Sequence, residues 1–385
     1  MTDNILVKIE HHIWSNFESE NDIGLMSGLT GTALFYHYAQ NSLNNLEYQD
    51  KLILCLEKIN YLLNNKFSTF SICNGLAGYG WLLLQIKNNS IDIDAEYLSD
   101  LDEMLFEELN IQINNNNFDF LHGAIGIVIY FIERYKSRKD NFIESILTNF
   151  TLELIQKIHT NLNMILEAPS GVDNSKCYYF GLAHGVSGLM NFLVHLDKSF
   201  LNSKIDITLP LTKCLNFLLQ NKKFNEASNQ FYPNSCDLNF DNNTIARLSW
   251  CQGDLGISNA LLNVGLFLKD DSLIKESLVL LENTQKIDLD KSFVKDFGFC
   301  HGSVGIMVQF YLMSKKTGFN YDKSILYWKN QLEFQTKNYQ TFESFVNNAY
   351  CNDTTVLTGA VGLALSIMTM EGTIDSKWLT CFNLF

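Results

Sequence analysis

The feature that most constrains this sequence is a pair of glycines three residues apart, which opens an apolar run and recurs seven times along 385 residues. The separations between successive first glycines are 47, 48, 62, 68, 49 and 57 residues. A spacing of about 50 residues is typical of a repeat architecture, in which each repeat is one supersecondary unit. The first glycines of the seven pairs are Gly28, Gly75, Gly123, Gly185, Gly253, Gly302 and Gly359.

Each repeat is predicted to contain two helices. Before a glycine pair the apolar residues recur every three or four positions, as in Leu52, Leu56, Ile59 and Leu63. This spacing places them on one stripe of a helix whose opposite face meets solvent. The run after a pair, such as AIGIVIYFI over 124–132, is apolar nearly all round and predicts a helix buried on every side. An outer helix therefore precedes an inner helix in each repeat.

These fourteen helices predict an all-α fold. They bury their faces consistently if the chain closes into an α/α toroid (barrel) of seven helical hairpins, with inner and outer rings of seven helices each. We expect the glycines, which share one helix face and lack Cβ atoms, to let neighbouring helix starts approach closely. The Asn-rich stretches 114–117 and 221–243 are predicted loops, and no linker divides the chain. Residues 1–385 are thus expected to form a single domain.

Composition and charge limit the classes of partner. Hydrophobic residues make up 46% of the chain and charged residues only 18%, as in a globular protein with a large core. The formal net charge is -14, and no basic run is interleaved with aromatics, which argues against nucleic acid as a partner. No apolar stretch approaches the roughly 18 residues of a membrane span, and the first residues lack the regions of a signal peptide. We therefore expect a cytoplasmic protein without an integral membrane segment.

If all inner helices begin at the same end of the toroid, the residues just before the glycine pairs converge on one mouth. The two residues before each of the seven pairs make up fourteen positions. Three of the nine cysteines and three of the eight histidines occupy them, which predicts a functional site. The residues one position before the glycines are Ser27, Asn74, His122, His184, Gln252, His301 and Thr358. Those two positions before are Met26, Cys73, Leu121, Ala183, Cys251, Cys300 and Leu357.

A metal site is predicted where repeats five and six adjoin, because Cys251 can lie there beside Cys300 and His301. Two thiolates and an imidazole favour zinc, and three protein ligands leave the fourth tetrahedral position for water or substrate. Cys73 belongs to repeat two, across the ring, and is left out. The alternative is two buried thiols with a capping histidine. The cysteines are 49 residues apart and form no short zinc-finger pattern, so the prediction depends on the repeat geometry.

Four other polar residues near the mouth each admit two interpretations. His184 and His122, in repeats four and three, are either catalytic or hydrogen-bonded structural histidines. Asp119 precedes its glycine by four residues and Arg247 precedes its own by six, so both are expected on the approach loops. For these two the alternative is a solvated loop charge.

Over essentially its whole length the sequence resembles the lanthionine synthetase C-like family, which includes the cyclases of lantibiotic biosynthesis. The segments that carry the resemblance are SWCQGDLG (249–256), FCHGSVG (299–305) and GLAHGVSG (181–188). It implies the seven-hairpin α/α toroid and a zinc ion, Zn²⁺. The ligands it implies are Cys251, Cys300 and His301.

The resemblance also implies roles for the remaining polar residues. His184 would be the acid/base histidine, with Asp119 and Arg247 as its accompanying polar residues. The segment FDFLHG (118–123) matches the aromatic-Asp signature of the bacterial cyclases, but His122 before the glycine departs from the family pattern.

The function implied is that of a zinc-dependent lanthionine synthetase, a cyclase that forms carbon–sulfur bonds. Its substrate would be a precursor peptide in which Ser or Thr has become dehydroalanine or dehydrobutyrine, and its product a lanthionine or methyllanthionine thioether ring. A separate dehydratase is the expected partner, and an exporter is a further candidate. Two alternatives stay open: addition of glutathione to dehydroamino acids, and a non-catalytic helical scaffold that binds peptides and holds zinc only structurally.

Overall fold

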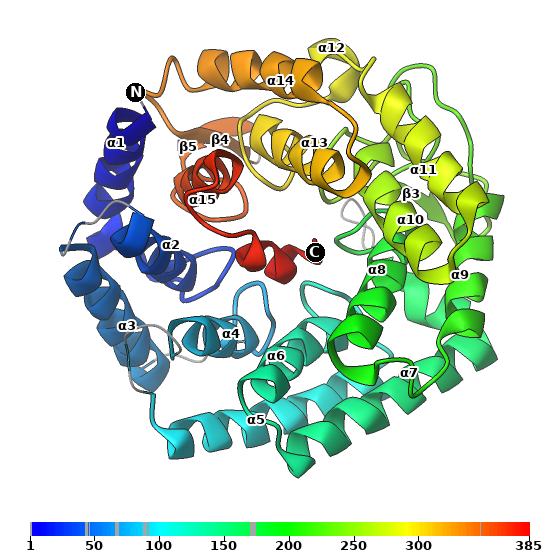
Figure 1. Cartoon of the computed structure of the whole chain (residues 1–385), viewed down its shortest axis with the longest axis horizontal. Coiled ribbons are helices and arrows are strands. Elements are labelled where there is room, and N and C mark those ends of the chain that lie inside the picture. The colour runs from blue at the N-terminus through cyan, green and yellow to red at the C-terminus, as the bar shows by residue number, and fades with distance from the viewer. Residues whose placement is uncertain are drawn as a thin grey trace. The chain divides into compact units, whose positions relative to one another are not determined.

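The computed structural model describes residues 2–42, 45, 47–65, 69–87, 91, 93–169, 175–346 and 348–385. Within them the chain is mainly helical (Figure 1). Seven helices begin one residue after the first glycine of each pair, and we call them the glycine-led helices. They are α2 (Leu29–Ser42), α4 (Leu76–Lys87), α6 (Ala124–Ser137), α8 (Val186–Leu196), α10 (Asp254–Leu268), α13 (Ser303–Thr317) and α15 (Ala360–Glu371).

One long helix precedes each glycine-led helix, as the repeat pattern predicts. In α3 the buried side chains are Tyr48, Leu52, Cys55 and Ile59, which form a single stripe, whereas in α4, which follows it, every residue except Gln85 and Lys87 is buried. The pairing of an amphipathic helix with a buried one is therefore confirmed. The preceding helices are α1 (Thr2–Ser15), α3 (Glu47–Asn65), α5 (Ala95–Asn114), α7 (Asn141–Leu166), α9 (Thr208–Gln220), α11 (Asp271–Thr284) and α14 (Asp322–Gln335).

Short elements interrupt this alternation. The helical ones are η1 (Phe17–Ser19), the π-helical turn η2 (Asp197–Leu201), α12 (Leu289–Ser292) and η3 (Lys377–Phe382). Strands β1 (Glu167–Pro169), β2 (Lys176–Tyr179) and β3 (Ser235–Asp237) form an antiparallel sheet, and β4 (Glu343–Val346) pairs with β5 (Ala349–Asn352).

The prediction of a plain loop over 221–243 is wrong in part, because β3 lies inside it. Residues of this three-residue strand pair with β2, for example Cys236 with Tyr178. A partner so distant in sequence cannot be read from local composition.

The chain divides into two compact units, each described separately below. Unit 1 comprises Met1–Glu108 and Lys295–Cys381, and unit 2 comprises Leu109–Val294 and Phe382–Phe385. Unit 1 therefore contains α1 to α4, α13 to α15 and the β4–β5 hairpin. Unit 2 contains α6 to α12 and the three-stranded sheet, and α5 contributes to both units. None of the described helices combines the length and the apolarity that crossing a membrane requires.

The glycine pairs let the loop of each repeat fold back beneath the start of its own helix. The N–H of Leu29, the first residue of α2, donates to Asp22 O at 2.8 Å. This bond satisfies one of the N–H groups that a helix start leaves without an intrahelical acceptor. A Cβ on Gly28 would lie 2.0 Å from Asp22 O, and one on Gly31 would lie 2.5 Å from Leu25 O.

The expectation that the glycines serve the approach of neighbouring helix starts is therefore only partly right. A Cβ on Gly78 would lie 2.7 Å from the Cβ of Leu25, which precedes α2, so an approach between repeats does occur. It would also lie 2.3 Å from Ile72 O in its own loop. The contact within the loop is the shorter of the two, so the turn of the loop constrains the glycine more tightly than the neighbouring repeat does. The glycine spacing alone does not distinguish these two constraints.

Backbone hydrogen bonds link the loops of successive repeats inside each unit. In each of these bonds the N–H of the residue two positions before a first glycine donates to the carbonyl of the corresponding residue in another repeat, which is the next repeat in three cases and repeat one for the donor in repeat seven. We call these bonds the loop-to-loop links. In unit 1 they are Met26 to Cys73 (2.8 Å), Leu357 to Met26 (3.0 Å) and Cys300 to Leu357 (2.7 Å), and in unit 2 Ala183 to Cys251 (3.3 Å).

Candidate functional site

In unit 2 a histidine and an aspartate from two different repeats form a hydrogen-bonded pair. His184 lies on the loop before α8, and Asp119 lies on the loop before α6. His184 Nδ1 and Asp119 Oδ2 are 2.6 Å apart, with 38% of the histidine side chain and 17% of the aspartate side chain exposed. The structure thus brings together two predicted site residues that are 65 positions apart in sequence.

The loop of repeat three explains the position of Asp119. Its Oδ1 accepts a hydrogen bond from the backbone N–H of His122 at 2.7 Å. In three other repeats the residue four positions before the glycine makes the same bond through a hydroxyl: Ser71, Ser249 and Thr355. A carboxylate has two oxygens, so Asp119 closes the turn with one and reaches His184 with the other.

Electrostatics favour the charged form of this pair. Burial disfavours imidazolium, but the charge and the hydrogen bond of Asp119 outweigh it and raise the pKa of His184. The Cys251 sulfur acts in the same direction. Burial likewise opposes ionisation of Asp119, but His184 and the His122 backbone N–H outweigh it and lower the pKa of Asp119. A protonated His184 beside a carboxylate is a competent proton donor.

A second histidine stands beside the pair. The rings of His122 and His184 are 6.1 Å apart between centroids, with an angle of 17° between their planes. Burial lowers the pKa of His122, which Asp119 only partly offsets, and His184 lowers it further. The two neighbouring histidines therefore have pKa shifts of opposite sign.

Both histidines line a pocket of about 450 Å³ in unit 2. Asp119 also borders this pocket, and Tyr179 of β2 contacts His184 with the ring centroids 5.9 Å apart. Much of the remaining wall is apolar and includes Phe118, Phe120, Ile125, Ile165, Leu166 and Leu189. A pocket with an apolar wall and a few convergent polar groups is the usual form of a small binding site.

Cys251 lies on the loop before α10, next to the loop that carries His184. The Cys251 carbonyl accepts the loop-to-loop link from Ala183, and a Cβ on Gly181 would lie 2.1 Å from the same oxygen. Only a glycine permits this approach. The half-buried Cys251 sulfur is 3.4 Å from Ser249 Oγ, which also accepts a hydrogen bond from the Gln252 N–H.

Cys300 and His301 lie on the equivalent loop of unit 1, before α13. Cys300 is 8% exposed, and its backbone N–H donates the loop-to-loop link to Leu357. His301 Nε2 is 3.8 Å from Asp296 Oδ2. Asp296 is almost completely buried, and its two oxygens accept hydrogen bonds from the N–H groups of Gly298 and Phe345.

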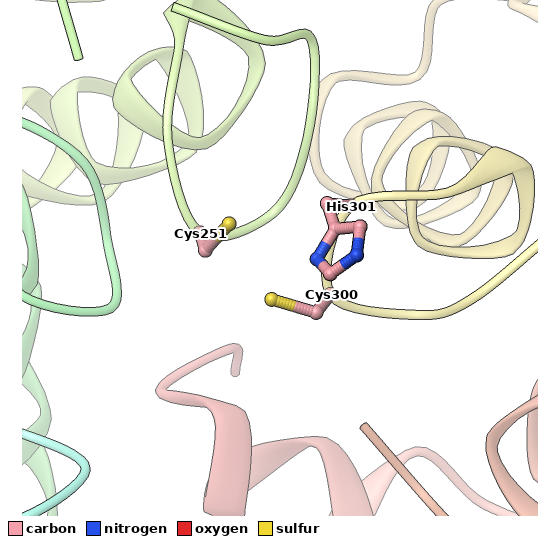
Figure 2. Close-up of side chains that lie close together, drawn as sticks. All are labelled: Cys251, Cys300 and His301. Atoms are coloured by element: carbon pink, nitrogen blue, oxygen red, sulfur yellow. The ribbon is translucent and has the colours of Figure 1, made fainter. Parts of the chain in front are cut away.

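Figure 2 shows the three predicted metal ligands, Cys251 on one loop and Cys300 and His301 on the other. Two thiols and one imidazole are a set that could hold a metal ion. Their chemistry fits zinc, which takes sulfur and nitrogen ligands. Cys73, on the loop before α4, is buried and does not belong to this set.

Arg247 lies six residues before Gly253 and is half-buried. Its backbone N–H donates to Gln252 Oε1 at 3.3 Å, and its carbonyl would lie 2.4 Å from a Cβ on Gly253. Gly253 has a φ of 85°, which also favours glycine. Within the described residues no ion pair or hydrogen bond joins the guanidinium to Asp119 or His184, so its predicted role stays a prediction.

Sequence reasoning missed Asp296, the buried carboxylate beside His301. A signal for it exists, because the position six residues before the first glycine is acidic in three repeats, at Asp22, Asp296 and Asp353. In each of them Oδ1 accepts a hydrogen bond from the N–H two residues later. The aligned repeats therefore identify Asp296 as a turn carboxylate before the structure does, but not its burial, because Asp22 and Asp353 are only half-buried.

The site and the fold together define an all-α repeat protein with a hydrogen-bonded histidine–aspartate pair and two cysteine-bearing loops. Residues 19–383 match the family described as Lanthionine synthetase C-like protein, and this chain belongs to that family. It is similar to the Nisin biosynthesis protein NisC of Lactococcus lactis subsp. lactis, with 24% identity over 313 residues, covering 74% of this chain and 72% of that protein.

A solved structure named Nisin cyclase has the same fold. Its TM-score is 0.74 at 20% sequence identity, and the match covers 100% of this chain and 96% of that chain. At this identity the likeness concerns the fold alone. It confirms the predicted fold class, the all-α repeat fold of the lanthionine synthetase C-like family.

Proposed function

We propose that this protein is a zinc-dependent lanthionine synthetase. It adds the cysteine thiols of a dehydrated precursor peptide to dehydroalanine or dehydrobutyrine and so forms lanthionine or methyllanthionine rings. The observation that carries the proposal is the His184–Asp119 pair at a pocket, in a chain of this family. The similarity to NisC, a nisin biosynthesis protein, supports the same assignment.

Cys251, Cys300 and His301 would hold the zinc ion. The donor set supports this role, since zinc prefers sulfur and imidazole ligands and three protein ligands leave one position for a substrate. Zinc supplies acidity, because a thiol that coordinates it ionises at neutral pH. Asp296 suits the carboxylate that commonly orients a ligating imidazole. Since Cys251 belongs to a different compact unit from the other two ligands, the proposal requires their loops to meet.

His184 is the proton donor to the substrate carbon. When a thiolate adds to the β-carbon of a dehydro residue, negative charge moves onto the neighbouring carbonyl oxygen, and the α-carbon must then take up a proton. Nδ1 of His184 faces Asp119, so the proton leaves from Nε2. Asp119 orients the ring and favours imidazolium, so His184 is protonated before each addition.

Arg247 is proposed to stabilise the enolate oxygen. Its guanidinium forms no hydrogen bond or ion pair with the described residues, so its donors are available to a substrate. A positioned cationic donor at a developing oxyanion lowers the barrier because the charge forms where the donor already points.

The proposed reaction implies which partner proteins act before and after this one. A separate dehydratase would prepare the peptide by removing water from Ser and Thr, and an exporter would take the finished product. This proposed order supports a cytoplasmic location, where the precursor is made.

Cyclisation of a dehydrated peptide tests the proposal. The addition leaves the peptide mass unchanged, so the remaining thiols are counted by alkylation with N-ethylmaleimide and mass spectrometry. We expect the wild type to consume thiols, and His184→Asn to be about 100-fold slower or more because it cannot supply the proton. The matched control is His159→Asn, an exposed histidine on α7 outside the pocket, which should keep the wild-type rate.

Zinc content is the second readout. About one zinc per chain is expected, lost in Cys251→Ala and kept in Cys351→Ala, which changes an exposed cysteine of β5. Zinc-loaded wild type that attaches added glutathione to the peptide but closes no ring would assign the protein to glutathione addition instead. Protein that holds zinc, binds the peptide and forms no thioether would be a scaffold.

A further inference from the structure

The pocket contains an imidazole that the mechanism above does not use. His122 stands directly before the glycine that caps α6, and its ring lies beside that of His184, 6.1 Å away between centroids. Both side chains border the same pocket of about 450 Å³. In a pocket where a proton is transferred, one of two neighbouring imidazoles can accept the proton and the other can donate it.

Asp119 fixes the two histidines in different ways. Its Oδ2 hydrogen-bonds the ring of His184 at 2.6 Å, whereas its Oδ1 accepts from the backbone N–H of His122 at 2.7 Å. The ring of His184 is therefore held directly. The ring of His122 is placed only through its backbone, which leaves both of its nitrogens available.

No described residue occupies the ring nitrogens of His122. The His122 side chain is exposed, and no described residue hydrogen-bonds either ring nitrogen. His184 uses only Nδ1, so its Nε2 is available as well. With their ring centroids 6.1 Å apart, the two imidazoles are too distant for a direct hydrogen bond, so a proton passing between them requires water. One water bridges donors and acceptors about 5.6 Å apart, at about 2.8 Å for each hydrogen bond.

The charges around the pocket separate the roles of the two histidines. The titratable groups that line it are Asp119, His122, His184, Glu167 of β1 and Tyr179 of β2, and Glu167 is paired with Lys176 at 2.7 Å. The pKa of His122 is lowered, which favours its neutral form, while the pKa of His184 is raised. Two groups shifted apart in this way suit a base and an acid.

We propose that His122 is the proton acceptor of the pocket, taking up the proton that the substrate thiol releases and passing it through water to His184. This inference rests on the proposed function. The thiol S–H bond breaks and its proton goes to His122, while the sulfur bonds to the β-carbon. The α-carbon takes a proton from Nε2 of His184. Transfer from His122 to His184 then restores both residues, so no proton is gained or lost in a turnover.

His122→Gln tests the relay, because glutamine approximates the size of histidine but cannot carry the proton. We expect cyclisation to slow about 100-fold. The loss of rate at low pH that accompanies protonation of His122 in the wild type should be absent from the variant, and added imidazole should restore part of the rate. His159→Gln on α7 is the matched control and should behave as wild type.

A His122→Gln protein with the wild-type rate and pH profile overturns the relay and leaves the cyclase assignment standing. If wild type forms no rings, the proposed function fails. The electrostatic coupling between His122 and His184 is then measured separately, by nuclear magnetic resonance titration of the imidazole nitrogens. The pKa of His122 should then be higher in His184→Asn than in wild type, because a neighbouring positive charge is removed. Identical titration curves for His122 overturn the relay in that case too.

Discussion

Asp119 in the loop before α6 and Thr355 in the loop before α15 occupy the same position of their repeats, four residues before the first glycine. Each accepts a hydrogen bond from the backbone N–H three residues later, at 2.7 Å from His122 and at 3.2 Å from Thr358. The threonine hydroxyl remains within its own loop, whereas the second oxygen of Asp119 reaches His184. A turn residue can also bind a side chain of the neighbouring repeat when it carries one acceptor more than the turn requires.

The largest effect is expected from Asp119→Ser, which installs the hydroxyl that Ser71 and Ser249 supply in their own repeats. The turn should survive because the serine can still accept from the N–H of His122. The contact with His184 should be lost, so the rate of cyclisation should fall about 100-fold while the melting temperature changes little.

Thiol alkylation and thermal unfolding measure the two effects side by side. Thr355→Ser, which exchanges one hydroxyl for another, is the control and should change neither. The comparison between the two loops fails if Asp119→Ser cyclises peptide as fast as wild type.

A smaller effect is expected from Gly181→Ala, which addresses how the His184 loop meets its neighbour. The new Cβ would lie 2.1 Å from Cys251 O and 2.7 Å from Gln252 Cα, so the two loops must separate. Overpacking of this kind typically costs about 1–3 kcal/mol, which urea unfolding would detect.

Gly318→Ala is its matched control, because a Cβ there has no neighbour within 4 Å and the only cost is a φ of 73°. That backbone cost is about 1 kcal/mol. A loss of stability in Gly181→Ala no larger than in the control would contradict the close contact between the loops.

The smallest effect is a pH dependence of stability. The raised pKa of His184 stabilises the fold below its ordinary value of 6.5, and this contribution is lost as the pH rises through the raised pKa. The lowered pKa of Asp119 stabilises the fold above its ordinary value of 3.8, and this contribution is lost as the pH falls through the lowered pKa. Both contributions are present together between pH 3.8 and 6.5.

Thermal unfolding of wild type and Asp119→Ser at pH 5.5 and pH 9 measures this dependence. The difference between the two proteins should be larger at pH 5.5, where imidazolium and carboxylate are both charged. An equal difference at the two pH values would mean that the carboxylate acts on stability only as a turn residue.

The starts of the glycine-led helices leave a mark in the sequence, because each follows a glycine that the backbone itself requires. The α2 helix begins directly after Gly28, where a Cβ would meet Asp22 O at 2.0 Å. Such a constraint is local and leaves a mark in the sequence. Strand β3 leaves none, because its three residues are defined by partners in β2.

The candidate site was likewise predictable only in part. The sequence placed Asp119 and His184 on loops near one another, and the family resemblance suggested their roles. It could not predict that one carboxylate serves both the turn and the imidazole, because the hydrogen bond from His122 depends on loop geometry. Asp296 was missed because its turn position shows only when the repeats are aligned, and its burial depends on the surrounding fold.

The loop-to-loop links have a consequence for how such a site evolves. They join backbone N–H to backbone carbonyl, so methionine, leucine, alanine and cysteine all serve equally at the linked positions. Substitution there leaves the connection between repeats intact. A thiol can therefore be gained, lost or moved from one repeat to another at these positions while the backbone connection between the repeats stays the same.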